Sequence, residues 1–200
     1  MRVHEALEQL DAIHEHLARA EVYRGFKVPG VALVGFVGIA AAASQSRILG
    51  NPEPALFIAY WLIVAAIGAM LGFSATAQAY FIREEEFARR KTRRVLAQFL
   101  PCVAAGGLMT AAVVRNSPEF TSFLPPLWAI VFGLGMISAR PYLPRGIGIV
   151  GLGYVLAGGL LVLRSPDAEL SGWSVGGVFG AGHLLTALVL WCDRPRESDA

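Results

Sequence analysis

The stretch RGIGIVGLGYVLAGGLLVLR, residues 145–164, decides how the whole chain is interpreted. It contains GIGIVG, which matches the G-x-G-x-x-G pattern of dinucleotide-binding proteins. That pattern forms a cofactor site only where a buried strand precedes the glycines. Here the preceding residues read SARPYLPR, and two prolines with two arginines do not form a central strand. We therefore interpret the stretch as a glycine-rich transmembrane helix.

Charged residues are scarce and unevenly distributed along the chain. They make up 16% of the residues and hydrophobic residues make up 55%, whereas globular domains carry about 25% charge. Six uncharged runs are each long enough for a helix that crosses a hydrocarbon core of ~30 Å. The sequence thus predicts an all-α membrane protein with six transmembrane helices. Within a transmembrane domain of residues 27–192, the expected spans are 28–46, 55–75, 95–114, 123–139, 146–163 and 173–192.

The basic residues indicate how these spans are oriented. Lys and Arg resist translocation and collect in cytoplasmic loops. With the N-terminus inside, all of them fall on the cytoplasmic side except Arg47, Arg115 and Arg164. We therefore expect both termini in the cytoplasm and a multi-pass protein of the cell membrane. A charged loop, residues 83–94, and a tail, residues 193–200, are expected on the same side.

Residues 1–26 are expected to form an amphipathic cytoplasmic helix. Apolar residues at heptad spacing place one seam along it, which a partner helix or a second copy of the chain would cover. A cleaved signal peptide is the alternative, because Ala41–Ala43 supplies small residues, but the mixed charge before the first span disfavours it. The seam consists of Val3, Ala6, Leu10, Ile13, Leu17 and Ala20.

The loop 83–94 reads REEEFARRKTRR and combines acidic and basic residues at helical spacing. Glu85 with Arg89, and Glu86 with Arg90, are i, i+4 pairs that stabilise a helix. The basic end of the loop is expected to bind an acidic helix or lipid phosphate. The alternative is a solvated linker whose arginines only fix the topology. The expected interaction residues are Arg89, Arg90, Lys91, Arg93 and Arg94.

Glycines recur at helical spacing in the fifth and sixth spans. Small residues let helix backbones approach closely in lipid, where no hydrophobic force drives one helix against another. We therefore expect one glycine face of each span to pack against another helix. The expected packing residues are Gly151, Gly158, Gly172, Gly176 and Gly180.

One ionisable residue is expected near the middle of the bilayer. His183 lies about ten residues after Trp173, or ~15 Å into a core of ~30 Å. Burial disfavours the charged imidazolium, so we expect a neutral ring that forms hydrogen bonds within the bundle. Its expected partners are Thr186, Tyr154 and Thr110. A packed interhelical hydrogen bond is the structural interpretation, and a ligand or proton-pathway role is the functional one.

The spans hold few groups that carry out chemistry. No Asp, Glu, Lys or Arg lies in the middle of any span. This excludes catalytic sites built on paired aspartates or on an H-E-x-x-H metal motif within the membrane. Six spans with a histidine in the sixth resemble rhomboid proteases, but G-x-S-G is absent and Ser138 differs too much in depth from His183. A polar stripe in residues 4–15 is typical of an amphipathic helix rather than a metal site. We expect no enzymatic activity, no cofactor and no metal.

Two apolar motifs carry a resemblance to a group of known sequences. QFLPC, Gln98–Cys102, begins the third span, and PPLWAIVFGLG, Pro125–Gly135, lies in the fourth. In these motifs the chain resembles uncharacterised bacterial six-span integral membrane proteins of about 200 residues. The resemblance implies a bacterial inner-membrane location and no particular activity.

Three classes of function follow from these observations. The first is a non-enzymatic regulatory or scaffolding module that acts through its cytoplasmic helix and loop, with a cytoplasmic protein, a second copy or anionic lipid as partner. The second is a small-solute transporter, because two sets of three spans would have opposite orientations, as in inverted-repeat carriers. The third is a lipid-active membrane enzyme. A nucleic-acid partner is not expected.

Overall fold

Long helices make up almost all of the described chain. The computed structural model describes residues 27–82, 86–163 and 170–193, and these residues contain no strand. Two 3-10 turns, Pro118–Phe123 and Arg140–Tyr142, flank the fourth long helix, and a π turn, Trp173–Gly177, leads into the last. The α-helices are α2 (Val28–Leu49), α3 (Pro54–Ile82), α4 (Glu86–Asn116), α5 (Leu124–Ala139), α6 (Arg145–Val162) and α7 (Val178–Cys192).

Six segments of the described chain are long and apolar enough to cross a membrane. Each coincides with a span expected from the sequence, so the described residues confirm an all-α fold with six helices that are long and apolar enough to cross a membrane. The short turns beside α5 and α7 belong to these segments, because they continue the helical path. The six segments are Val28–Leu49, Pro54–Ser74, Thr92–Asn116, Pro118–Tyr142, Arg145–Val162 and Trp173–Cys192.

Prolines and one glycine account for several helix boundaries. A proline lies in the first turn of α2 and of α5, where its fixed φ suits a helix start and its missing N–H costs nothing. α2 ends at Gly50, whose φ of 60° lies in the left-handed region that favours glycine. α3 then begins at Pro54, only a few residues further on.

The described part of the charged segment 83–94 is helical, in agreement with the i, i+4 spacing of its charged residues. α4 begins at Glu86, so residues 86–94 are its first turns rather than a loop. Alanine, arginine and lysine favour a helix, and no glycine or proline interrupts this stretch. The helix also continues through Pro101 in its interior. The basic residues are therefore continuous with the third span along one helix.

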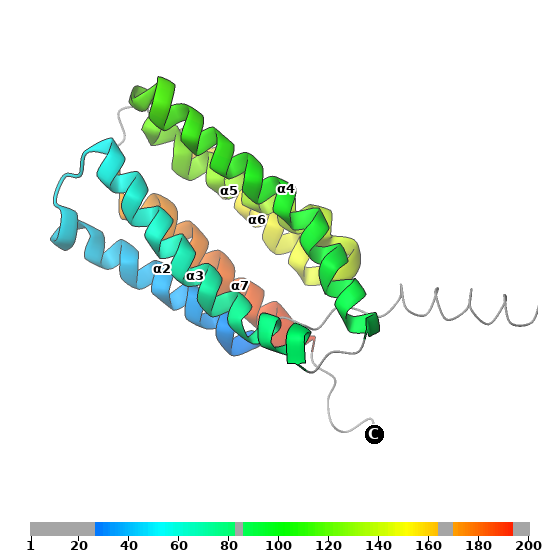
Figure 1. Ribbon diagram of the computed structural model, residues 1–200. Coiled ribbons are helices and arrows are strands. Elements are labelled where there is room, and N and C mark those ends of the chain that lie inside the picture. The colour runs from blue at the N-terminus through cyan, green and yellow to red at the C-terminus, as the bar shows by residue number, and fades with distance from the viewer. Residues whose placement is uncertain (1–26, 83–85, 164–169, 194–200) are drawn as a thin grey trace, which may run out of the picture.

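The helices form two groups of three that do not match the two halves of the sequence. In the first group α2 contacts both α3 and α7, and in the second α5 contacts both α4 and α6 (Figure 1). The two groups meet mainly where α6 contacts α7, and through the π turn beside α5. α3 and α4 share few contacts although they are consecutive in the chain. The last helix thus completes the group formed by the first two.

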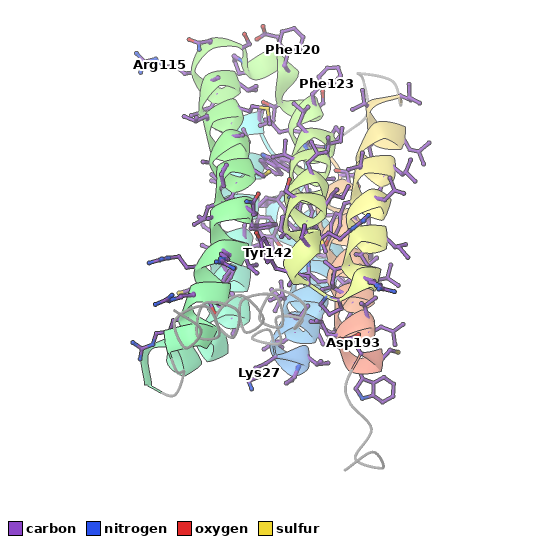
Figure 2. The ribbon with its side chains drawn as sticks, turned by 90° about the vertical axis from the view of Figure 1, so that its right-hand side faces the viewer. Lys27, Arg115, Phe120, Phe123, Tyr142 and Asp193 are labelled. Atoms are coloured by element: carbon purple, nitrogen blue, oxygen red, sulfur yellow. The ribbon has the colours of Figure 1, made fainter. Side chains whose placement is uncertain are left out.

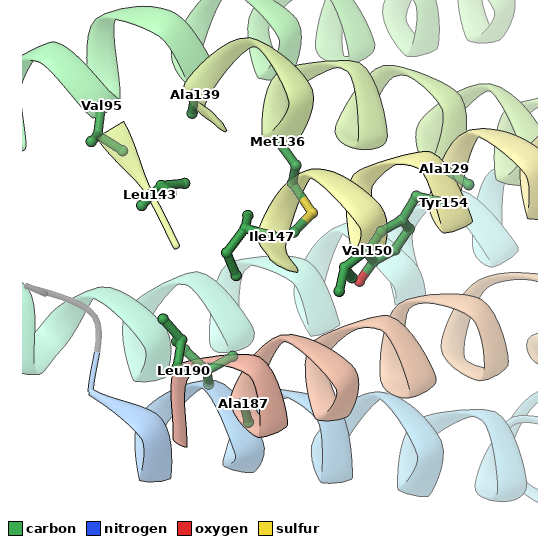
Figure 3. Packing of buried hydrophobic residues seen from close by; sticks show 11 residues of the cluster. Val95, Ala129, Met136, Ala139, Leu143, Ile147, Val150, Tyr154, Ala187 and Leu190 are labelled. Atoms are coloured by element: carbon green, nitrogen blue, oxygen red, sulfur yellow. The ribbon is translucent and has the colours of Figure 1, made fainter. Parts of the chain in front are cut away.

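Buried side chains form two apolar clusters, and large apolar side chains also face outward. Tyr154 and Ile147 of α6 lie in the larger cluster, between α5 and α7 (Figure 3). The smaller cluster surrounds Phe57 and Trp61 of α3. On the outer surface Leu108 is 72% and Ile149 74% exposed, which would be costly in water and is favourable against acyl chains.

The described charged side chains gather at the two ends of the bundle. Figure 2 shows Lys27 and Asp193 near one end and Arg115 near the other. Because the spans alternate in direction, the starts of α4 and α6 lie at the end with Lys27. Among the described side chains, that end holds the bases Lys27, Arg89, Arg90, Arg93, Arg94, Arg140 and Arg145 and the acid Asp193, and the opposite end holds Arg47, Arg115, Glu53 and Glu119. We refer to the former as the basic end.

Candidate functional site

Two polar side chains from different helices meet inside the bundle: the half-buried His183 of α7 and the buried Tyr154 of α6. Nδ1 of His183 lies 3.0 Å from the Tyr154 hydroxyl and 2.8 Å from the carbonyl oxygen of Phe179. The Tyr154 hydroxyl also donates to the Phe179 carbonyl, at 3.1 Å. The three groups thus form a compact hydrogen-bonded triangle that joins α6 to α7.

The structure selects one of the three expected partners of His183. Tyr154 contacts the imidazole, whereas Thr186 donates to the carbonyl of Gly182 in its own helix, at 2.8 Å. Thr110 accepts a hydrogen bond from the Trp128 indole at 2.8 Å, which links α4 to α5 away from His183. The structure thus brings Tyr154 to His183 and leaves the two threonines in other hydrogen bonds.

Aromatic rings enclose the histidine and tyrosine side chains. The ring centroid of Phe132 on α5 lies 5.6 Å from that of His183 and 5.1 Å from that of Tyr154. Phe179 on α7 lies 5.4 Å from Tyr154 by the same measure. The cluster therefore draws two rings from each group of helices, so that it forms the joint between the groups.

Gly182 creates the space that the Tyr154 side chain occupies. A Cβ atom at position 182 would overlap the Tyr154 ring and lie too close to its hydroxyl. Sequence reasoning did not select Gly182, because it lies outside the stripe of Gly172, Gly176 and Gly180. The sequence did contain a signal for this space: a glycine directly precedes the histidine, and a small residue at that position leaves room for a partner of the imidazole.

The chemistry that this arrangement supports is hydrogen bonding. Neutral phenol and imidazole groups each offer a donor and an acceptor. Within the described residues no group of three or more His, Cys, Asp or Glu is placed to hold a metal ion. The geometry supports a packed interhelical contact, with the imidazole orienting the phenol.

The His183 hydrogen bond should contribute about 1 kcal/mol to stability. We expect His183→Asn to retain this contribution, because an asparagine amide group can occupy the position of Nδ1, whereas His183→Leu should lose it. Tyr154→Phe should cost a similar amount, and the double variant should cost less than the sum, measured by unfolding in mixed micelles. Loss of function in His183→Asn at unchanged stability would contradict the structural interpretation.

Both predicted glycine faces pack closely against neighbouring helices. A Cβ atom at Gly158 would lie 2.6 Å from the carbonyl oxygen of Pro126, and one at Gly151 would lie 2.9 Å from that of Gly133, both on α5. The sixth-span stripe packs against α2: a Cβ atom at Gly180 would lie 3.0 Å from the carbonyl oxygen of Gly35. Gly172 and Gly176 contact α2 with the same closeness. All five glycines thus lie against the backbone or side chains of a neighbouring helix.

A second polar cluster, at the end opposite the basic end, was missed by sequence reasoning. Gln45 of α2 is only 4% exposed, accepts a hydrogen bond from the Trp61 indole at 2.8 Å, and donates to the carbonyl of Leu170 at 3.0 Å. A cavity of about 280 Å³ lies beside it, with Asn51, Ser171 and other uncharged residues in its wall. A glutamine inside an otherwise apolar run was the available signal, because a buried amide needs partners.

The predicted cytoplasmic interaction residues are only partly described. Arg89, Arg90, Arg93 and Arg94 are exposed on the first turns of α4, and Lys91 belongs to the same helix. The seam residues Val3, Leu10, Ile13 and Leu17, with Ala6 and Ala20, lie outside the described residues. Their interaction with a partner stays a prediction.

No protein-family model, no curated protein and no solved structure matches this chain. The bacterial group suggested by Gln98–Cys102 and Pro125–Gly135 therefore stays a resemblance in sequence alone.

Proposed function

We propose that this chain is a non-enzymatic, multi-pass protein of the cell membrane that acts as a regulatory or scaffolding module. Its basic end faces the cytoplasm, and its N-terminal segment and the start of α4 interact with a partner there. The bundle holds these elements in fixed positions relative to one another. The partner of the N-terminal segment is a cytoplasmic protein helix or a second copy of this chain.

The observation that carries this proposal is the position of the elements that extend beyond the bilayer. α3 has 29 residues and α4 has 31, so each is more than ~40 Å long and exceeds a core of ~30 Å. Their consecutive ends, Ile82 and Glu86, lie at the basic end. Lys27, to which residues 1–26 are joined, and Asp193 lie near that end too (Figure 2). At the opposite end, only Gly50–Glu53 separates α2 from α3.

The packing of the bundle supports a holding role. Backbone contacts at Gly151 and Gly158 fix α6 against α5, and those at Gly176 and Gly180 fix α7 against α2. Close backbone approach of this kind resists sliding of one helix along another, because any displacement brings carbonyl groups into collision. A partner that binds at the basic end therefore meets helices that are held in place within each group, and the contact of Tyr154 with His183 joins the two groups.

A small-solute transporter is the second candidate, and one observation favours it. The cavity beside Gln45 lies near the end opposite the basic end and has hydrogen-bonding groups in its wall. The two groups of helices exchange the third span of each half of the chain, an arrangement that an inverted repeat allows. Thermal stabilisation of the purified protein by a solute would favour transport over scaffolding.

The N-terminal seam gives the test of the proposed function. We expect Leu10→Asp to abolish chemical crosslinking of the intact protein to its cytoplasmic partner in cells, because a charge in the apolar seam opposes helix pairing. Ala12→Asp adds the same charge away from the seam and should leave the crosslinked product unchanged. If two differently tagged copies are coexpressed and crosslink to each other, the partner is a second copy of this chain. Unchanged crosslinking of Leu10→Asp, or the absence of any crosslinked product, would contradict the proposal.

A further inference from the structure

We propose that Arg93 and Arg94 form a binding site for the phosphate groups of anionic lipids in the leaflet at the basic end. The inference deepens the proposed function, because it assigns a partner to the start of α4. It rests on the membrane insertion of that proposal and does not depend on a protein partner. Arg89 and Arg90 lie one turn further from the bilayer on the same side of α4.

The rotation of α4 is fixed by its buried residues. Thr92 and Val95 are each 3% exposed, so this side of the helix faces the bundle. Arg93 and Arg94 are exposed. At about 100° per residue around the helix axis, the pair Arg93 and Arg94 lies roughly opposite the pair Thr92 and Val95. The two guanidinium groups are therefore carried on the outward side of the bundle.

The same outward side of α4 continues into the membrane as an apolar surface. Leu100 is 56% and Leu108 72% exposed, and Ala104 between them is exposed as well. These residues fall within about the same 100° sector as Arg93 and Arg94. Since the apolar part of this surface contacts acyl chains, the arginines directly above it lie among the headgroups rather than against another part of the protein.

The depth of the arginines agrees with this position. Between Arg94 and Arg115, α4 rises about 32 Å, which matches a hydrocarbon core of ~30 Å. Arg115 lies at the other end of the bundle (Figure 2). With Arg115 at one interface, Arg93 and Arg94 lie at the other, at the level of the phosphate groups. Adjacent guanidinium groups bind phosphate oxygens with paired, charge-assisted hydrogen bonds.

Charge complementarity favours anionic lipid over a neutral one. Glu85 and Glu86 lie one turn before Arg89 and Arg90 and offset their charge, whereas Arg93 and Arg94 have no acidic residue three or four positions away in the sequence. Such a surface attracts anionic headgroups, and each Arg near the membrane surface adds to the attraction. The two arginines therefore select lipids whose phosphate carries net charge over lipids in which a choline neutralises it.

The experiment uses the purified full-length protein in detergent, with phosphatidylglycerol or phosphatidylcholine added and bound lipid counted by native mass spectrometry. We expect preferential retention of phosphatidylglycerol, and a loss of roughly tenfold or more in its affinity in the double variant Arg93→Gln and Arg94→Gln. The matched control, Arg47→Gln with Arg115→Gln, removes the same charge at the other end and should bind as the unaltered protein does. Arg93→Lys with Arg94→Lys keeps the charge and should retain most of the binding.

Several outcomes would overturn this inference. Equal binding of the two lipids, an unchanged affinity in the Gln variant, or an equal loss in the control variant would each contradict it. Glycerol phosphate added alone should not compete, and effective competition would indicate a soluble phosphate ligand instead. Unchanged lipid binding combined with lost crosslinking in the Gln variant would assign the arginines to an acidic protein. Failure of the Leu10→Asp test alone would leave the lipid site intact, so the two proposals fail separately.

Discussion

Replacing Gly158 with alanine should lower the free energy of unfolding by about 2–3 kcal/mol. The added Cβ atom would lie 2.6 Å from the carbonyl oxygen of Pro126 and 2.7 Å from Cγ1 of Ile130. Backbone atoms of α5 cannot rotate away as a side chain can, so α6 has to move. Because α5 and α6 form the most extensive helix pair in the bundle, this movement disturbs much of one group.

The next residue supplies the control for this substitution. A Cβ atom at Gly159 meets no atom within 4 Å, so Gly159→Ala should be neutral or should stabilise α6 by up to about 1 kcal/mol through its helix propensity. Reversible unfolding of both variants in mixed micelles measures the difference. Equal stability of the two variants would show that α6 does not pack against α5 through Gly158.

The number and position of the spans could be predicted from the sequence because the cost of burying charge in lipid is large. Each uncharged run had to become a helix, since only a helix satisfies its own backbone within the bilayer. The glycine faces were also predictable, because close approach in lipid selects small residues at i and i+4. Gly151 and Gly176 thus indicated close packing before their neighbours were known.

The neighbour that each face meets could not be predicted from the sequence. Pairing depends on how all six helices rotate and pack together, and the sequence pattern fixes only which face is small. Tyr154 and Thr110 lie at similar depth, so the sequence could not show which of them is the partner of His183. The grouping of α7 with α2 and α3 depends on the same global packing.

Two other features escaped sequence reasoning for local reasons. The helix of the third span begins at Glu86, well before the expected span, because charge marks the membrane boundary but does not end a helix. Gln45 was overlooked because one amide barely changes the hydropathy of a long run. Its importance comes from Trp61 and Leu170, which are distant in sequence and reach it only in the folded bundle.

The central claim is that six helices cross the membrane with the basic end in the cytoplasm, and reporter fusions test it most directly. A reporter enzyme that is active only in the periplasm should be active when fused after Glu119, and also after Asp167, which lies outside the described residues. The same reporter should be inactive when fused after Glu86 or at Ala200, because the positively charged segments beside these positions resist translocation. Activity of the fusion after Glu86 would contradict the account, since it would place the arginines of α4 outside the cell.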